Sequence, residues 1–165
     1  MRVLRRVNPS GKLPVTWIQS LSDLPAYPDM SMTTTPGRTY RYFTGTPLLK
    51  FGHGMSYTTF RFTSPHVPAL NGPCGGIPVT VQLNNTGLVD GTEVVQVYLQ
   101  TPFNQPPNPT IRLAGFQRVS LAPASTAEVV FSVGTCCLAI NGPCCDTLAH
   151  WHYCDVVYSH PCCAA

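Results

Sequence analysis

Residues 36–60, which read PGRTYRYFTGTPLLKFGHGMSYTTF, constrain the fold of this chain more than any other stretch. They place two prolines and four glycines among aromatic and histidine side chains. Proline removes a backbone donor and glycine has low helix propensity, so this composition argues against an amphipathic helix. We therefore expect an extended segment that crosses the surface of another part of the protein.

Two kinds of side chain in this run are candidates for a site. His53 lies between Gly52 and Gly54, so it either lines a cleft or is a buried structural histidine at a tight crossing. We expect the second, because glycines permit close approach of backbones. Arg38 and Arg41 can grip a carboxylate or sugar hydroxyls, but we expect them to pair across a junction between domains.

The composition indicates a part that leans on a neighbour. Charged residues make up 10% of the chain, where a soluble domain has roughly 25%. The net charge of +3 is small, and no aromatic platform or recognition helix accompanies the basic residues, so no nucleic-acid partner is expected. No stretch approaches the roughly 20 apolar residues of a membrane span, so no membrane partner is expected either.

Alternating apolar residues predict strands in the second half of the chain. In residues 77–83 the side of the strand that carries Ile77 is apolar, and residues 127–133 show the same alternation. In 93–99 we expect Val95, Val97 and Leu99 to point inward and Gln96 and Tyr98 outward. In 113–121 a bulge near Gly115 should turn Phe116 inward, with Val119 or Leu121. Short strands separated by turns predict an antiparallel sandwich.

Several motifs resemble glycoside hydrolase family 3, the β-xylosidases and β-glucosidases. GRTYR at 37–41 and FGHGMSY at 51–57 are similar to the stretch that joins the second and third domains of these enzymes. VQLNNTG at 81–87, GTEVVQVY at 91–98 and LAGFQRV at 113–119 resemble their fibronectin type III-like domain. The resemblance covers about residues 3–133 and implies the C-terminal part of such an enzyme.

This resemblance implies a domain order. Residues 1–62 would be the end of the second, α/β sandwich domain and a crossing segment, 63–76 a linker, 77–133 the fibronectin type III-like domain, and 134–165 a cysteine-rich tail. The predicted fold is all-β, an immunoglobulin/fibronectin type III-like antiparallel sandwich that can lack edge strands. An extended N-terminal segment precedes it, and an irregular tail, either disordered or held by disulfides, follows it.

The resemblance also implies a role without chemistry. A retaining glycosidase needs two carboxylates about 5 Å apart. The chain has seven acidic residues, and no pair of them shares a predicted pocket. In the family the nucleophile and the acid/base lie upstream of the matching region. We therefore predict no catalytic residue and no cofactor, and a structural brace for a parent that hydrolyses O-glycosyl bonds. The expected partners are the parent's catalytic domains, with an oligosaccharide as a further candidate.

Seven of the eight cysteines lie in the tail, which leaves four interpretations open. Adjacent cysteine pairs do not suit one tetrahedral metal ion, so no metal site is predicted. Disulfides are an alternative, with Cys74 paired to Cys136 or Cys137. A disordered extension ranks level with disulfides, and a reactive Cys154–His152 pair ranks last.

The cysteines also indicate an oxidising compartment. We expect a secreted or extracellular parent, although residues 1–6 lack the apolar run of a signal peptide. Asn84-Asn85-Thr86 is a glycosylation sequon, which makes Asn84 a candidate acceptor.

Two other functions compete with the brace. The first is a stand-alone carbohydrate-binding module, in which exposed aromatic side chains stack on sugar rings: Tyr40, Tyr42, Phe43 and Tyr57. The second is a cysteine-rich metal or redox protein.

Overall fold

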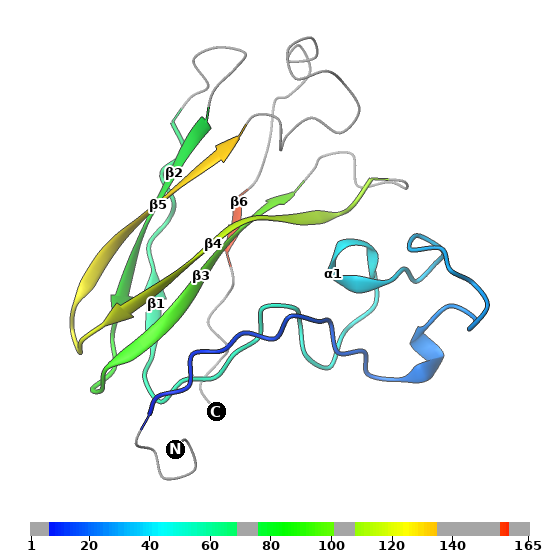
Figure 1. Ribbon diagram of the computed structural model, residues 1–165, viewed down its shortest axis with the longest axis horizontal. Helices are drawn as coiled ribbons and strands as arrows, with labels where there is room; N and C mark the ends of the chain where they lie inside the picture. The colour runs from blue at the N-terminus through cyan, green and yellow to red at the C-terminus, as the bar shows by residue number, and fades with distance from the viewer. Residues whose placement is uncertain (1–6, 69–75, 101–107, 135–155, 159–165) are drawn as a thin grey trace.

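A computed structural model describes residues 7–68, 76–100, 108–134 and 156–158 (Figure 1). Its helical elements are a 3-10 turn, η1 (Leu21–Asp23), and a single-turn helix, α1 (Thr39–Tyr42). The strands in these residues are β1 (Phe60–Phe62), β2 (Gly76–Asn85), β3 (Gly91–Gln100), β4 (Ile111–Leu121), β5 (Thr126–Gly134) and β6 (Val156–Tyr158).

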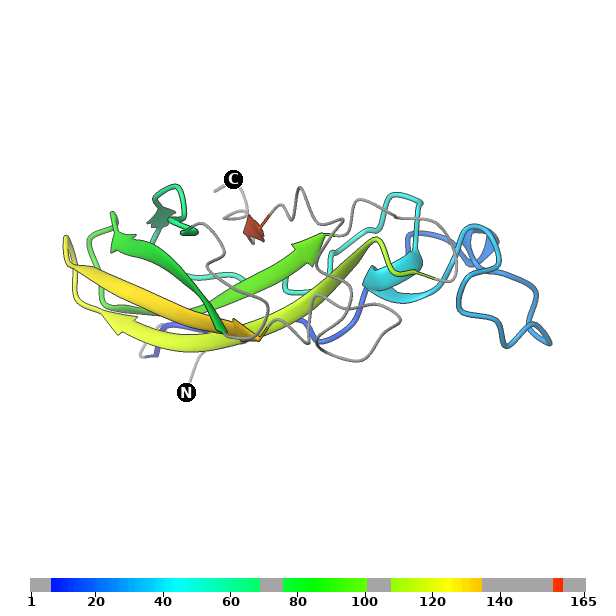
Figure 2. The same cartoon turned by 90° about the horizontal axis from the view of Figure 1, so that it is seen from above.

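The strands form two three-stranded sheets, and every pairing is antiparallel. The first sheet has the order β1-β2-β5, and the second has the order β4-β3-β6. Figure 2 shows β2 and β5 lying over β3 and β4 as separate layers. The predicted all-β antiparallel sandwich is therefore confirmed. Within the tail, residues 156–158 were expected to be irregular but form β6, which pairs with Val97–Leu99 of β3.

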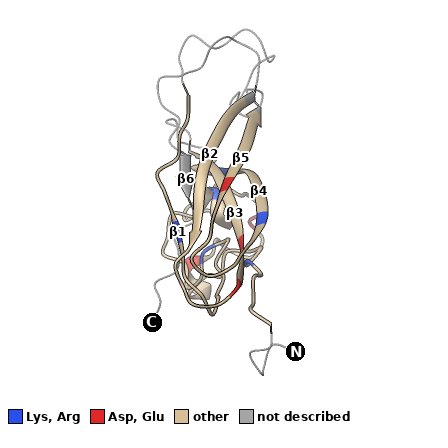
Figure 3. Ribbon diagram, turned by 90° about the vertical axis from the view of Figure 1, so that its left-hand side faces the viewer, with Lys and Arg blue, Asp and Glu red and all other residues tan. Residues whose placement is uncertain are grey.

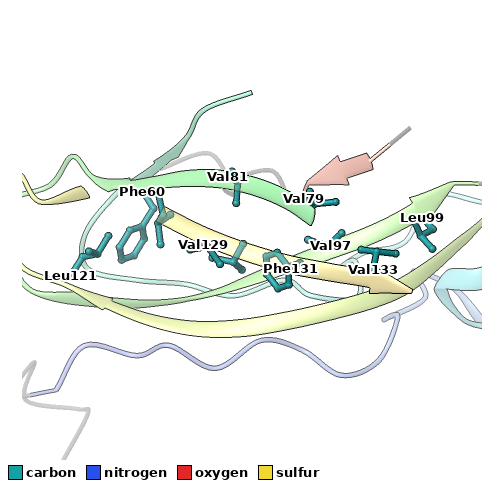
Figure 4. Packing of buried hydrophobic residues seen from close by; sticks show 11 residues of the cluster. Phe60, Val79, Val81, Val97, Leu99, Leu121, Val129, Phe131 and Val133 are labelled. Atoms are coloured by element: carbon teal, nitrogen blue, oxygen red, sulfur yellow. The ribbon is translucent and has the colours of Figure 1, made fainter. Parts of the chain in front are cut away.

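The core lies between the two sheets, where the period-two patterns placed it (Figure 4). From the first sheet it receives Val79, Val81 and Leu83 of β2 together with Val129, Phe131 and Val133 of β5. From the second sheet it receives Val95, Val97 and Leu99. Each of these side chains contributes about 1.5–3 kcal/mol when fully removed from water, so alternation alone identified most of the hydrophobic stabilisation.

The bulge in β4 is present, but its effect on Phe116 was predicted wrongly. Val97 pairs with Gly115 and Tyr98 pairs with Leu113, which leaves Ala114 as the extra residue. The bulge therefore precedes Gly115, and Gly115 keeps the inward parity of Val119 and Leu121. Phe116 points outward and is 70% exposed. A Cβ on Gly115 would lie 3.2 Å from Phe131 Cδ1, so the Phe131 ring occupies the space that a larger side chain would need.

Residues 7–58, here called the N-terminal segment, run along the second sheet instead of joining the sandwich (Figures 1 and 2). Its two passes, 11–17 and 48–54, are antiparallel and hydrogen-bonded to each other. The Trp17 amide donates to the Leu49 carbonyl at 2.8 Å, and the Leu13 amide donates to the His53 carbonyl at 2.7 Å. Only Gly37, Gly52 and Thr58 of the segment are buried, so it has no apolar core of its own.

Candidate functional site

The candidate site is the contact between the N-terminal segment and β3. The side chains of β3 that face the core are buried. Gln96 and Tyr98, which lie on the other side of the strand, are buried as well. Gln96 and Tyr98 point away from the core, as the alternation predicts. They are nevertheless only 6% exposed because the segment covers them. Three groups of contacts make this cover.

The first contact is an ion pair between Lys12 Nζ and Glu93 Oε1. The two side chains are 15% and 10% exposed, so the pair is largely withdrawn from water. Gly54 makes room for it, because a Cβ there would lie 2.7 Å from Lys12 Cδ and 2.6 Å from the Gly11 carbonyl oxygen. Sequence patterns missed this pair, since Glu93 occupies an ordinary position near the start of a strand. Partners 81 positions apart leave no local signal.

The second contact places Gly52 directly against β3. Gly52 has φ +79°, and a Cβ on it would lie 2.3 Å from Gln96 Oε1 and 2.9 Å from Tyr98 Oη. The Tyr98 hydroxyl donates to Gln96 Oε1 at 2.9 Å. The predicted tight crossing at the Gly52-His53-Gly54 run is present, and the glycines on both sides of His53 make it possible. His53 was expected to be buried, but it is only half-buried.

The third contact is a cluster of three aromatic rings. Tyr40 stacks on Phe51 with centroids 4.2 Å apart, and both rings meet Tyr98 edge-on, at 6.1 and 6.3 Å. The Leu113 amide of β4 donates to Tyr40 Oη at 3.2 Å. Burial, together with the nearby Tyr40, raises the pKa of Tyr98 to about 12, because a phenolate would lose its hydration here.

Two asparagines fasten the end of the segment. Asn8 Oδ1 accepts from the Tyr57 amide at 2.9 Å, while Asn8 Nδ2 donates to the Asp90 carbonyl at 2.8 Å. Asn85 is 0% exposed, and its Oδ1 accepts from Thr58 Oγ1 at 2.6 Å. Its Nδ2 donates to the Val89 carbonyl at 2.9 Å and to the Leu121 carbonyl at 3.2 Å. The segment is thus tied to both sheets through a buried amide.

Comparison with known proteins identifies this arrangement. A family model described as a fibronectin type III-like domain matches residues 93–140. "Probable beta-glucosidase I" of Aspergillus niger is 39% identical over 143 residues, covering 74% of this chain and 17% of that protein. "Beta-xylosidase" of Formosa agariphila is 35% identical over 131 residues, covering 78% of this chain and 18% of that protein.

Solved structures agree. β-Glucosidase 3B from Thermotoga neapolitana superposes with a TM-score of 0.69 and 32% identity, over 82% of this chain and 20% of that one. A GH3 exo-β-xylosidase, XlnD, gives a TM-score of 0.65 and 27% identity, over 80% of this chain and 20% of that one. The chain is the counterpart of the C-terminal part of family 3 glycoside hydrolases. It includes their fibronectin type III-like domain and spans less than a fifth of the length of these curated relatives.

The acidic residues that a family 3 reaction would need do not gather in the part of the chain that the structure describes. Asp23 is in η1, Asp29 is in a loop, Asp90 precedes β3, Glu93 is paired with Lys12, and Glu128 is exposed on β5. Figure 3 shows these acidic positions at separate places along the ribbon. Asp146 and Asp155 lie outside the described residues.

Arg38 and Arg41 make local contacts. Arg38 Nη2 donates to the Asp29 carbonyl at 2.7 Å, and the Arg41 guanidinium lies 5.7 Å from the centre of the Tyr42 ring. The pKa of Asp29 is lowered chiefly by the hydrogen bond from the Ser31 amide. Neither arginine Nε has a hydrogen-bond partner among the described residues, so pairing across a domain junction stays a prediction.

The remaining predicted positions are divided between described and undescribed parts. Asn84 lies in β2, opposite Arg61 of β1 and Thr126 of β5. Cys74, Cys136, Cys137 and the Cys154–His152 pair lie outside the described residues. Across residues 7–68, 76–100, 108–134 and 156–158, no group of three or more His, Cys, Asp or Glu side chains is arranged to hold a metal ion. No helix in these ranges is long and apolar enough to cross a membrane.

Proposed function

We propose that this chain is a non-catalytic part of a family 3 glycoside hydrolase, in which the fibronectin type III-like sandwich braces the catalytic domains. The parent would hydrolyse O-glycosyl bonds as a β-glucosidase or β-xylosidase, the two activities for which the relatives are named. The observation that carries the brace is the attachment of the N-terminal segment to β3. An ion pair, a positive-φ glycine and three packed rings attach the N-terminal segment there.

The exposed apolar side chains of the N-terminal segment support a large neighbour. Exposed apolar surface of this kind marks an interaction site. We propose that the catalytic domains cover these side chains, because the matching region is only 13–22% of the relatives compared. We call this set the apolar lobe, and it comprises Trp17, Leu21, Tyr27, Met30 and Leu48, with exposed fractions of 55–93%.

The carbohydrate-binding alternative has less support. A sugar stacks on an open aromatic face, but one face of Tyr40 is used by Phe51 and its hydroxyl accepts from Leu113. Tyr42 lies beneath the Arg41 guanidinium, and the Phe43 ring packs against Gly45, where an added Cβ would lie 2.6 Å from it. These rings serve the fold of the segment, which favours the brace.

Purified full-length chain provides the first test. With nitrophenyl β-glucoside and β-xyloside we expect no nitrophenol release above a buffer blank, and with xylan or cellulose no retention in a pull-down. Release that co-purifies with the chain through two columns would contradict the non-catalytic role. Retention on a polysaccharide would favour the binding module.

A chimera tests bracing itself. Residues 7–134 of this chain would replace the matching part of Thermotoga neapolitana β-glucosidase 3B, and heat inactivation of its hydrolase activity would be measured. We expect Tyr27→Asp to shorten the half-life at least several-fold, because it places a charge in the apolar lobe. Leu88→Asp is the matched control, since Leu88 is 94% exposed and Tyr27 is 93% exposed, but Leu88 lies in the β2–β3 loop. Equal half-lives for the two variants would contradict docking through the lobe.

A further inference from the structure

The sequon at Asn84 lies at the end of β2, where strand alternation sets the direction of each side chain. Leu83 and Asn85 are both fully buried, so Asn84 between them points to the outer side of the first sheet. Its cross-strand neighbours are Arg61 of β1 and Thr126 of β5, and both are exposed. The acceptor position is therefore flanked by side chains that already stand in water.

The surroundings of Asn84 on this outer side are polar. Gln82 lies two residues earlier on the same strand, and Glu128 pairs opposite Gln82. Both are exposed. A glycan is bulky and hydrophilic, so it fits a surface of this kind and would displace no apolar packing. The outer side of the second sheet differs, because the N-terminal segment already covers it at Gln96 and Tyr98.

The three sequon residues have different tasks in the fold. The Asn85 side chain makes the buried hydrogen bonds described above, and the Thr86 hydroxyl lies 2.8 Å from Thr59 Oγ1. The fold thus accounts for Asn85 and Thr86 without any modification. The Asn84 side-chain amide makes no hydrogen bond within the part of the chain that the structure describes. Asn84 itself is half-buried, and its Nδ2 is not used by a hydrogen bond of the fold in these residues.

We propose that Asn84 is an N-glycosylation site whose glycan covers the outer side of the β1-β2-β5 sheet. In the transfer, Asn84 Nδ2 forms a bond to the anomeric carbon of a polyprenyl-diphosphate-linked oligosaccharide. The bond from that carbon to the diphosphate oxygen breaks, the polyprenyl diphosphate leaves with the electron pair, and the amide loses one proton. The site is independent of the bracing role, because it lies on the sheet that the segment does not cover.

Translation of the full chain behind a cleavable secretion leader, with endoplasmic-reticulum microsomes present, tests the site without requiring folding. We expect one glycoform, removed by peptide-N-glycosidase, which leaves Asp at position 84 for peptide mass mapping to detect. Asn84→Gln should abolish the glycoform. Asn108→Gln should leave it unchanged, because proline at 109 excludes that sequon. An unmodified wild-type chain, or a glycoform that survives Asn84→Gln, would overturn the proposal.

A second measurement tests the outer-side assignment. Chain secreted from yeast would be melted before and after enzymatic deglycosylation. A substituent on a free surface changes stability by at most about 0.5 kcal/mol, which corresponds to about 1–2 °C for a chain of this size. A gain in melting temperature of more than about 5 °C on removing the glycan would show that it collides with the fold.

Discussion

Gly52 lies against the buried pair Gln96 and Tyr98, so Gly52→Ala tests whether this contact fastens the N-terminal segment to β3. At φ +79° an alanine carries left-handed strain of about 1–2 kcal/mol. Its Cβ would also fall 2.3 Å from Gln96 Oε1. The Gln96 amide must then move, which breaks its hydrogen bond from Tyr98 at a further cost of about 0.5–1.5 kcal/mol.

These two effects together destabilise the folded chain by about 1.5–3.5 kcal/mol. For a chain of this length each kcal/mol lowers the melting temperature by about 2–4 °C, so we expect a decrease of about 3–14 °C. The loss should be local as well as global, because the Gly52 amide donates to the Leu13 carbonyl and joins the two passes of the segment.

Circular dichroism melting measures the global effect, and hydrogen exchange read by mass spectrometry measures the local one. Peptides covering 11–17 and 48–54 should exchange faster in Gly52→Ala than in the wild type. Gly11→Ala is the matched control within the same segment, since nothing lies within 4 Å of its added Cβ and its φ is not positive. Gly11→Ala should be neutral, or should stabilise the chain by up to about 1 kcal/mol because alanine lowers the conformational entropy of the unfolded state. If both variants melt together, the contact at Gly52 does not fasten the segment.

Three further predictions concern the same interface. Lys12→Met should destabilise the chain by about 1–3 kcal/mol because it leaves the Glu93 charge largely buried, and Lys12→Met with Glu93→Leu should recover most of this loss in a urea-unfolding double-mutant cycle. Asn85→Ala should lower the free energy of unfolding by about 2–4 kcal/mol in the same assay, since it removes a buried amide and leaves its hydrogen-bond partners unpaired. The Tyr98 pKa is raised to about 12 from 10.0, so the unfolded chain releases this proton first as pH rises. Stability from Tyr98 should be complete below pH 10 and lost between pH 10 and 12, and urea midpoints that fall equally in wild type and Tyr98→Phe over this range would contradict the assignment.

The sandwich core was predictable because its signal is local. Val79, Val81 and Leu83 alternate within one strand, and a strand places alternate side chains on opposite sides whatever surrounds it. β1 was not predicted, because Phe60–Phe62 is only three residues long and pairs with the far end of β2. β6 escaped for the same reason, since three residues carry too little periodicity to show a strand.

The candidate site was predictable only in part. The glycines beside His53 indicated a close crossing, because little else explains two glycines around one histidine. Nothing in the sequence showed what they cross. The alternation gave Gln96 and Tyr98 their outward direction, yet it contains no information about a segment more than 40 positions away that covers them. The prediction for Phe116 failed for another reason. The extra residue of the bulge is Ala114, so Gly115, and not Phe116, shares the inward direction of Val119 and Leu121.

The N-terminal segment depends on the sandwich for its conformation, whereas the sandwich has a core of its own. The clustered core begins at Phe60, and the segment before it buries only Gly37, Gly52 and Thr58. A stretch without a core cannot offset the entropy of ordering itself, at about 1–2 kcal/mol per residue, so its conformation must come from what it contacts. β3 supplies one of these contacts. In the proposed function the catalytic domains would supply the other, at the apolar lobe, so that bracing would consist of ordering a segment that has no core of its own.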